Sequence, residues 1–211
     1  MSFTTNILRS IKRMFFPLTV LSWNREEEDT ENLIWRLPDE NYPDIDDVDQ
    51  VLVKETERVA IFNQGTFKDT LAQGKHDIFE NVDEIIFLDV SPKTLPFGIP
   101  RSQGPLTKDN KRVGFSGKIS FSIQENPVSI GSFLTKYANG KKEITSEEFI
   151  TWLRTGPLLG VFRDILRDIT GEEFQGMDKF DILMELESKL GAELNVIGVE
   201  IDDLEITNIV Q

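Results

Sequence analysis

Between residues 50 and 90, apolar residues recur at every second position in short runs. This alternation predicts β-strands, because successive side chains of a strand point to opposite faces. The predicted strands are Gln50–Lys54, Glu57–Asn63, Phe67–Leu71, Lys75–Phe79 and Glu84–Val90. Turns with glycine, such as Asn63-Gln64-Gly65, separate neighbouring runs. This part of the chain is therefore expected to form an antiparallel sheet.

Residues 91–110 lack this pattern and are expected to be a long irregular connection. They contain Pro92, Pro96, Pro100 and Pro105, and proline cannot donate a hydrogen bond to a sheet. Residues 112–124 follow as the clearest strand. One parity is mostly apolar and the other is polar or glycine, which predicts one buried and one solvent-exposed face.

Helices are predicted from residue 126 onward. Asn126-Pro127 can begin a helix that runs to Tyr137, and Thr145-Ser146-Glu147-Glu148 has the form of a capping box. Further helices are expected over Leu158–Ile169 and Asp178–Leu190, with Gly191 ending the latter. A last strand is expected at about residues 193–207. Strands, then helices, then a strand predict an α+β architecture.

An amphipathic helix is predicted within residues 1–24, the N-terminal segment. Arg9, Lys12 and Arg13 lie beside or opposite its apolar stripe, and Pro17 should end or kink it. The stripe has the three- and four-residue spacing of one helix face and consists of Ile7, Leu8, Ile11, Met14, Phe15 and Leu18.

Residues 25–49 form an acidic stretch, which predicts a solvated linker with an apolar anchor at Leu33-Ile34-Trp35. Pro38 and Pro43 disfavour a continuous helix there. The predicted organisation is therefore the N-terminal segment 1–24, the acidic linker 25–49, and one folded domain over residues 50–211.

The charge distribution separates the N-terminal segment from the rest. It carries three cations and no acid, whereas the 211-residue chain has a net charge of −14, so the remainder carries −17. Three interpretations stay open. The segment packs on the domain or on another subunit, or it lies on an anionic membrane as an interfacial helix. The third interpretation is a secretory signal, and the lack of a small-residue cleavage site argues against it.

Composition removes several function classes. The excess of acids argues against a nucleic-acid partner, because phosphate contacts need clustered cations. The sequence has no cysteine, which excludes disulfides, thiolate metal sites and a cysteine nucleophile. Together with the lack of an Asn-x-Ser/Thr sequon, this fits a cytoplasmic protein. No apolar run is long enough to span a bilayer.

Catalytic motifs are lacking. The only histidine, His76, has no nucleophile in a recognisable motif beside it, so a structural or surface role is expected. Acid pairs such as Asp164/Asp168 and Asp202/Asp203 leave open a metal-dependent acidic hydrolase, although solvated faces and helical ion pairs explain them more simply. We predict no catalytic residue, no metal site and no cofactor.

Two segments resemble a known family. QVLVKETERVAIFNQGTFKDTLAQGKHDI, residues 50–78, resembles the opening hairpins of the SPFH (band 7) superfamily, the domain of stomatin, prohibitin and flotillin. Glu57-Arg58 and Gly74-Lys75-His76 match its pattern, and Ala72 departs from it. LPFGIPRSQGPLTKDNKRVGFSGKISFSIQENP, residues 95–127, resembles the virion-core-protein-like branch. The similarity covers residues 48–207.

The resemblance implies a β-rich N-terminal half, a helical C-terminal half and a closing strand. It also implies a non-enzymatic, self-assembling membrane scaffold that recruits other proteins, phage-shock-protein-A-like ones among them. Relatives usually continue into a coiled coil or a metal-binding ribbon, and residues up to Gln211 show neither heptads nor cysteines. The hydrophobic hairpin of stomatins is absent from the sequence, so the N-terminal segment is the expected anchor.

The leading hypothesis is therefore a homo-oligomeric scaffold, peripheral on the inner face of the cell membrane. Its contacts with anionic lipid or a partner would come from Ile7, Leu8, Arg9, Ile11, Lys12, Arg13, Met14, Phe15 and Leu18. The alternatives are a soluble module that docks through its N-terminal helix into a protein groove, and the metal-dependent hydrolase.

Overall fold

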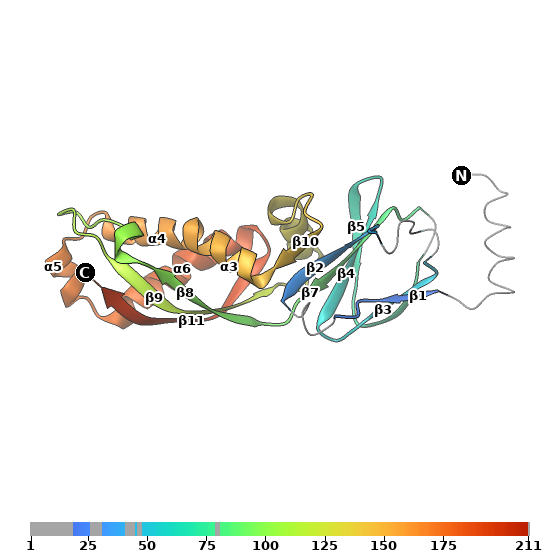
Figure 1. The fold of residues 1–211 in the computed structure, drawn as a ribbon, viewed down its shortest axis with the longest axis horizontal. Coiled ribbons are helices and arrows are strands. Elements are labelled where there is room, and N and C mark those ends of the chain that lie inside the picture. Colours follow the sequence, from blue (N-terminus) through green and yellow to red (C-terminus); the bar gives the residue numbers. More distant parts are fainter. Residues whose placement is uncertain (1–18, 26–30, 41–44, 46–47, 79–80, 211) are drawn as a thin grey trace, which may run out of the picture. The chain divides into compact units, whose positions relative to one another are not determined.

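The computed structural model describes residues 19–25, 31–40, 45, 48–78 and 81–210. The chain divides into two compact units (Figure 1). The first unit comprises residues 1–26 and 35–88, and the second comprises 27–34 and 89–211. Each unit is described by itself.

The first unit is built from short strands. They are β1 (Val20–Ser22), β2 (Asn32–Leu37, of which residues 32–34 belong to the second unit), β3 (Gln50–Val53), β4 (Glu57–Asn63), β5 (Thr66–Leu71), β6 (Gly74–Asp77) and β7 (Glu84–Asp89). One sheet has the order β1-β3-β6, and another contains β2-β7-β4-β5. The β3–β6 and β4–β5 pairs are antiparallel, whereas β1 pairs with β3 in parallel.

The core of the first unit is aliphatic with a few aromatic rings. Trp35 stacks on Phe87 with ring centroids 5.4 Å apart, and Trp23 lies 6.3 Å from the same ring. Burial of these side chains supplies the main driving force for folding of this unit. The buried members of this core are Leu21, Trp23, Leu37, Ile45, Val48, Val51, Val53, Val59, Ile78, Ile85 and Phe87.

The second unit combines one three-stranded antiparallel sheet with a layer of helices. Its strands are β8 (Lys93–Ile99), β9 (Gly114–Ile123), β10 (Glu143–Thr145) and β11 (Val199–Val210). Its helices are η3 (Arg101–Gln103), α2 (Pro127–Ser132), the π-helical turn η4 (Phe133–Tyr137), α3 (Ser146–Thr155), α4 (Pro157–Leu166), α5 (Gly171–Gly176) and α6 (Lys179–Val196). The sheet order is β11-β9-β8.

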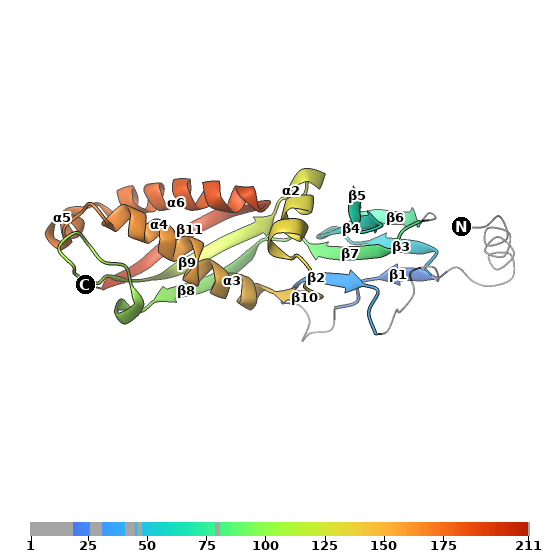
Figure 2. The ribbon, with the colours of Figure 1, turned by 90° about the horizontal axis from the view of Figure 1, so that it is seen from above.

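Helices α3, α4 and α6 cover one face of this sheet (Figure 2). Phe115 of β9 stacks on Phe162 of α4 with centroids 3.7 Å apart, and Phe121 of β9 lies 4.4 Å from Phe149 of α3. Because side chains alternate along a strand, the intervening residues of β9 point to the opposite face. That face, which carries Ser116 and Lys118, is called here the open face of the sheet.

Local sequence signals explain the helix boundaries. The Asn126 side chain accepts from the N–H of Ser129 and begins α2, and Thr145 forms the expected capping box with Glu148 at the start of α3. Both devices satisfy backbone donors that have no partner within the helix. The predicted α+β fold, with a β-rich N-terminal half, a helical C-terminal part and a closing strand, is confirmed.

The prediction of an irregular connection over residues 91–110 is wrong for residues 93–99, whereas residues 104–110 are irregular apart from an isolated bridge at Leu106. Lys93–Ile99 form β8, which pairs along its whole length with β9. β8 lies at the edge of the sheet, where Pro96 leaves no missing hydrogen bond because its nitrogen need not face a partner strand. The proline and glycine content of this segment is typical of a loop, although residues 93–99 form an edge strand.

The predicted end of the last helix at Gly191 is also wrong. α6 continues to Val196, because Leu194 supplies one more buried residue in phase with Leu186 and Leu190. A glycine inside a helix costs only about 1 kcal/mol, which this burial offsets. The chain reverses instead at Gly198, whose φ is +79°, so β11 begins at Val199 rather than near residue 193.

Two stretches outside the predicted domain contribute strands. The apolar anchor of the acidic stretch is β2, with Leu33, Ile34 and Leu37 buried, rather than part of a solvated linker. Residues 20–22 of the N-terminal segment form β1. The predicted amphipathic helix itself falls on residues 1–18, which lie outside the described residues.

Candidate functional site

Every residue predicted to contact a membrane or a partner lies in residues 1–18, outside the described part of the chain. The structure does describe the point where this segment joins the first unit. The N–H of Thr19 donates to Oδ2 of Asp49 at 3.0 Å, and the Thr19 carbonyl accepts from the N–H groups of Asp49 and Gln50 at 3.1 Å each. Thr19, near the C-terminal end of the N-terminal segment, is thus fixed at the start of β3.

A second attachment follows at a buried carboxylate. The side chain of Glu57 is fully buried, and its Oε2 accepts from the N–H of Lys54 at 3.1 Å, which closes the turn between β3 and β4. Its Oε1 lies 3.6 Å from Nη2 of Arg25 and 3.6 Å from Nζ of Lys54. A buried charge is tolerated when ion pairs and hydrogen bonds compensate its lost hydration.

The two cations also hold residues 23–25. Nζ of Lys54 donates to the carbonyl of Trp23, and the guanidinium of Arg25 lies 4.6 Å from the Trp23 ring centroid. Trp23 is in turn 4% exposed and belongs to the core. We call Trp23, Arg25, Lys54 and Glu57 the anchor cluster, because it fixes the chain between the N-terminal segment and the acidic stretch.

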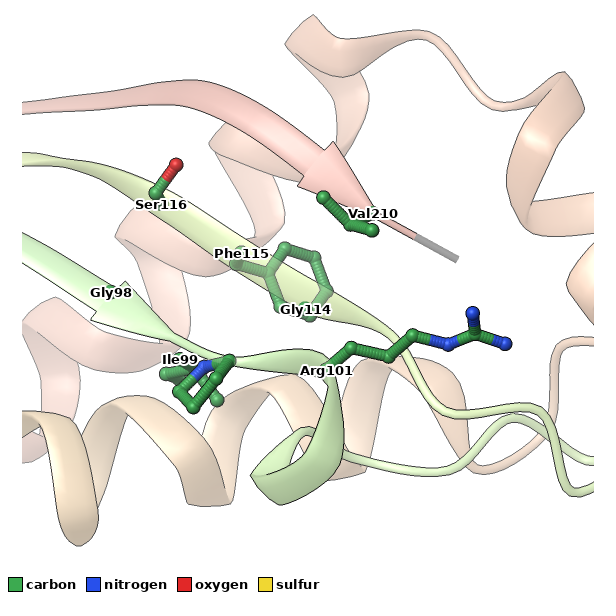
Figure 3. Close-up of a pocket in the computed structure, with 8 residues that line it drawn as sticks. Gly98, Ile99, Arg101, Gly114, Phe115, Ser116 and Val210 are labelled. Carbon is green, nitrogen blue, oxygen red and sulfur yellow. The ribbon is translucent and has the colours of Figure 1, made fainter.

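A hollow in the second unit is the other candidate site (Figure 3). Its volume is about 350 Å³, and it lies where β8 ends, β9 begins and β11 ends. Gly98 is in register with Ser116, and Val210 is in register with Gly114. These residues share the parity of the open face. Gly98 leaves the space that a side chain would occupy, whereas a Cβ at Gly114 would lie 2.7 Å from the backbone nitrogen of Arg101, so the backbone packs closely there.

The rim of this hollow carries one cation. Arg101 is exposed, and nothing within the described residues pairs with its guanidinium. Val210 is 45% exposed and gives the opposite rim an apolar surface. An apolar hollow beside a free guanidinium suits a group that combines apolar surface with a carboxylate.

The loop that leaves the hollow is fastened to the helical layer through Asp109. Its Oδ1 accepts from Oγ1 of Thr107 at 2.7 Å and from the N–H of Gly171 at 2.8 Å, and its Oδ2 lies 3.1 Å from Nζ of Lys111. The Thr107 hydroxyl, then the Gly171 N–H and Lys111, hold the pKa of this carboxyl well below its ordinary value.

Tyr137 ends the π-helical turn inside an aromatic cluster. Its ring lies 5.1 Å from Phe149 and 4.8 Å from Trp152, and its hydroxyl is buried without a hydrogen-bond partner in the described part of the structure. Burial, and then the charge of Glu148, raise the pKa of Tyr137. The wide turn, closed by the Ala138 N–H on the Phe133 carbonyl at 2.9 Å, brings these rings together.

Among the residues that the structure describes, the remaining titratable side chains form no catalytic constellation. His76 is half-buried, and its Nε2 lies 2.8 Å from the carbonyl of Ala72, which serves the tight β5–β6 connection. Asp168 pairs with Arg167 at 3.7 Å on the surface. Within the described ranges, no group of three or more His, Asp or Glu side chains is placed to hold a metal ion.

A model of the SPFH domain / Band 7 family matches residues 51–210, which is more than half of the chain. The chain belongs to the SPFH domain / Band 7 family. No curated protein matches it. The match is to the family as a whole, so the assignment to the virion-core-protein-like branch stays a prediction.

Membership in this family narrows the function. SPFH domains are generally non-enzymatic scaffolds or partner-binding domains, and they are often associated with membranes. Among the described residues, no helix is long and apolar enough to cross a bilayer. The family match starts at Val51 in β3, the strand to which β1 and Thr19 are attached.

The structure adds site residues of this SPFH domain that the sequence interpretation missed. In the sequence, Glu57 is part of the Glu57-Arg58 motif, and its parity with the buried Val59 is the signal that identifies it as an inward-facing acid. No sequence pattern indicates Arg101 or the hollow, because the hollow forms only when β8, β9 and β11 pair in their observed register.

Proposed function

We propose that this SPFH domain is a non-enzymatic scaffold that associates peripherally with the cytoplasmic face of a membrane, self-assembles and recruits partner proteins. Family membership carries this proposal. The N-terminal segment supplies the contact with anionic lipid, through its apolar stripe and its three cations. Such contacts are weak singly and gain strength when a homo-oligomer presents several of them.

The anchor cluster supports the role given to the N-terminal segment. A membrane-bound segment can position a domain only when the residues that connect the two are held to the domain. Here Thr19 and Arg25 are both held within the first unit. The body carries most of the acids of the chain, so anionic lipid repels it while the cationic segment is attracted. These opposite effects orient the domain away from the lipid surface.

Vesicle co-sedimentation tests the membrane contact. Three charge-neutralising substitutions, Arg9→Gln, Lys12→Gln and Arg13→Gln, remove the cations while keeping the segment. Each cation near an anionic surface contributes about 1 kcal/mol, so binding to phosphatidylserine-containing vesicles should fall about a hundredfold at low salt. Salt should weaken binding of the unmodified chain in the same assay.

A matched control loses the same charge elsewhere. Lys68, Lys118 and Lys142 are exposed, and replacing all three by Gln should leave vesicle binding almost unchanged. A deletion should remove residues 1–18 only, because Leu21 and Trp23 belong to the core. Equal binding by the full chain and this deletion would refute the role of the segment.

The soluble partner-binding alternative gives a different result in the same assay. It predicts no binding to vesicles of any composition, but tight binding of the full chain to a second protein that the deletion lacking residues 1–18 abolishes. The hydrolase alternative predicts a rise in melting temperature with millimolar Mg²⁺ or Mn²⁺, because a ligand that binds only the folded state stabilises it.

A further inference from the structure

An exposed aromatic residue near the start of α6 complements the hollow beside Arg101. Phe180 is 64% exposed, and Met184, one helical turn later on the same side, is 55% exposed. Asp181 adjoins Phe180 and is also exposed, and the described residues offer its carboxylate no ion pair. Phe180 and Asp181 thus present apolar surface and a carboxylate together, the combination that suits the hollow.

The hollow has the dimensions and the lining for such a group. About 350 Å³ lies near the lower end of the range for ligand sites, roughly 300–1,000 Å³. Gly98 has nothing within 4 Å of the position of an added Cβ, so the floor is open to an incoming ring. Val210 and the stem of Arg101 border the opening (Figure 3).

A single copy cannot bring these two surfaces together. The hollow opens on the open face of the sheet, because Gly114 and Ser116 have the parity opposite to Phe115, which stacks on α4. Phe180 belongs to α6, in the helical layer on the other face (Figure 2). The sheet therefore separates Phe180 from the hollow within the second unit.

We propose that Phe180 and Asp181 of one copy dock into the hollow of another copy, with the carboxylate of Asp181 on the guanidinium of Arg101. This inference rests on the proposed self-assembly and names its contact. Each copy offers both the hollow and its occupant on different surfaces, so the contact is heterologous and repeats from copy to copy. Repetition gives a closed ring or an open filament.

Charge reversal tests the pairing. In the full chain, Arg101→Glu or Asp181→Arg alone should weaken self-association about tenfold or more, and the two together should restore it, because the pair is re-formed with opposite polarity. Phe180→Ser should weaken it as well. Sedimentation velocity over a range of concentrations measures the association, and circular dichroism verifies that each variant is folded.

Matched controls use similar residues elsewhere in the second unit. Val128 is 79% exposed and Lys142 is exposed, so Val128→Ser and Lys142→Glu should leave association unchanged. Oligomers that persist in Arg101→Glu and Phe180→Ser would overturn this contact while self-assembly stands. A chain that stays monomeric at every concentration would overturn both. Failure of the double reversal to restore association would refute the Arg101–Asp181 pairing.

The lack of cysteine in the chain allows a direct second measurement. Oxidation of a mixture of two single variants, Ser116→Cys and Met184→Cys, should give a disulfide-linked dimer that contains one copy of each. Met184 is 55% exposed beside Phe180, so both variants keep the docking residues Phe180 and Asp181. The pair Ser116→Cys and Val128→Cys should give none. Equal cross-linking of both pairs would contradict the docking of Phe180 in the hollow.

Discussion

Oε1 of Glu57, a fully buried carboxylate, lies 3.6 Å from Nη2 of Arg25. This pair joins the start of β4 to the residues just after β1, which are 32 positions earlier in the chain. Oε1 accepts no hydrogen bond from the described residues, and the positive charges of Arg25 and Lys54 compensate its burial. This ion pair therefore attaches the chain at the C-terminal end of the N-terminal segment to the SPFH domain.

Removing the Glu57 carboxylate should weaken the attachment of the chain around Arg25 to the domain. Glu57→Ala removes the carboxylate that pairs with Arg25 and accepts from the N–H of Lys54, and we expect a loss of about 1–3 kcal/mol in the free energy of unfolding. Urea denaturation followed by tryptophan fluorescence measures it. Glu55→Ala is the control, because Glu55 is exposed and should cost less than about 0.5 kcal/mol. Equal losses would refute the anchoring role.

The lowered pKa of Asp109 makes the fastening of its loop dependent on pH. Because the folded-state pKa is below the ordinary value of about 3.8, the stability from this carboxylate is present above that value and is lost as the pH falls below it. Asp109→Asn should lower the melting temperature by a few degrees at pH 7, and the difference from the unmodified chain should shrink below pH 4.

Asp168→Asn is the control for the Asp109 prediction. The Asp168 side chain is 83% exposed, and within the described part of the chain its only ion pair is with Arg167 at 3.7 Å. Its replacement should change the melting temperature little at either pH. A difference for Asp109→Asn that stays constant from pH 7 to pH 3 would show that the charge of Asp109 does not carry the effect.

Much of the fold follows from short-range signals in the sequence. The strand at residues 57–63 and the helix starts at Asn126 and Thr145 are predicted correctly, because alternation and caps act within a few residues. β8 is not predicted from the sequence, because Pro96 is compatible with a strand only at the edge of a sheet, and the edge position depends on the tertiary structure. The extension of α6 through Gly191 likewise depends on a tertiary contact of Leu194.

The candidate sites depend still more on tertiary structure. Glu55 and Glu57 are chemically alike and two residues apart, yet only Glu57 is buried. The distinction arises from the turn that Lys54 closes with Glu57, and from Arg25 on another part of the chain. The hollow needs the register of three strands, which no local pattern encodes.

Tyr137 should resist ionisation up to the pH at which the protein unfolds. Its raised pKa means that the neutral form favours folding, and this contribution is lost as the pH rises above the ordinary value of 10.0. The sequence has two tyrosines, so a Tyr42→Phe background isolates Tyr137 in an ultraviolet titration. Ionisation of Tyr137 near pH 10 with the fold intact would contradict the burial of its hydroxyl.

Tyr137→Phe should be neutral or slightly stabilising at pH 7. The substitution removes a buried hydroxyl that has no partner in the described structure and keeps the ring contacts with Phe149 and Trp152. Tyr137→Ala, which also removes the ring, should cost about 3 kcal/mol. Urea denaturation of the two variants separates the roles of the hydroxyl and the ring, and a large loss in Tyr137→Phe would indicate an unobserved partner.

Two glycine-to-alanine substitutions should have opposite effects. A Cβ at Gly117 would lie 1.9 Å from the backbone oxygen of Glu205 and 2.8 Å from the ring of Phe97, so Gly117→Ala must push β9 and β11 apart. We expect a loss of about 3 kcal/mol or more. Gly160 lies inside α4 with nothing within 4 Å of an added Cβ, so Gly160→Ala should stabilise by about 0.5–1 kcal/mol through helix propensity. Thermal and urea unfolding measure both. A stable Gly117→Ala variant would contradict the close approach of β11 to β9, on which the position of Val210 beside the hollow depends.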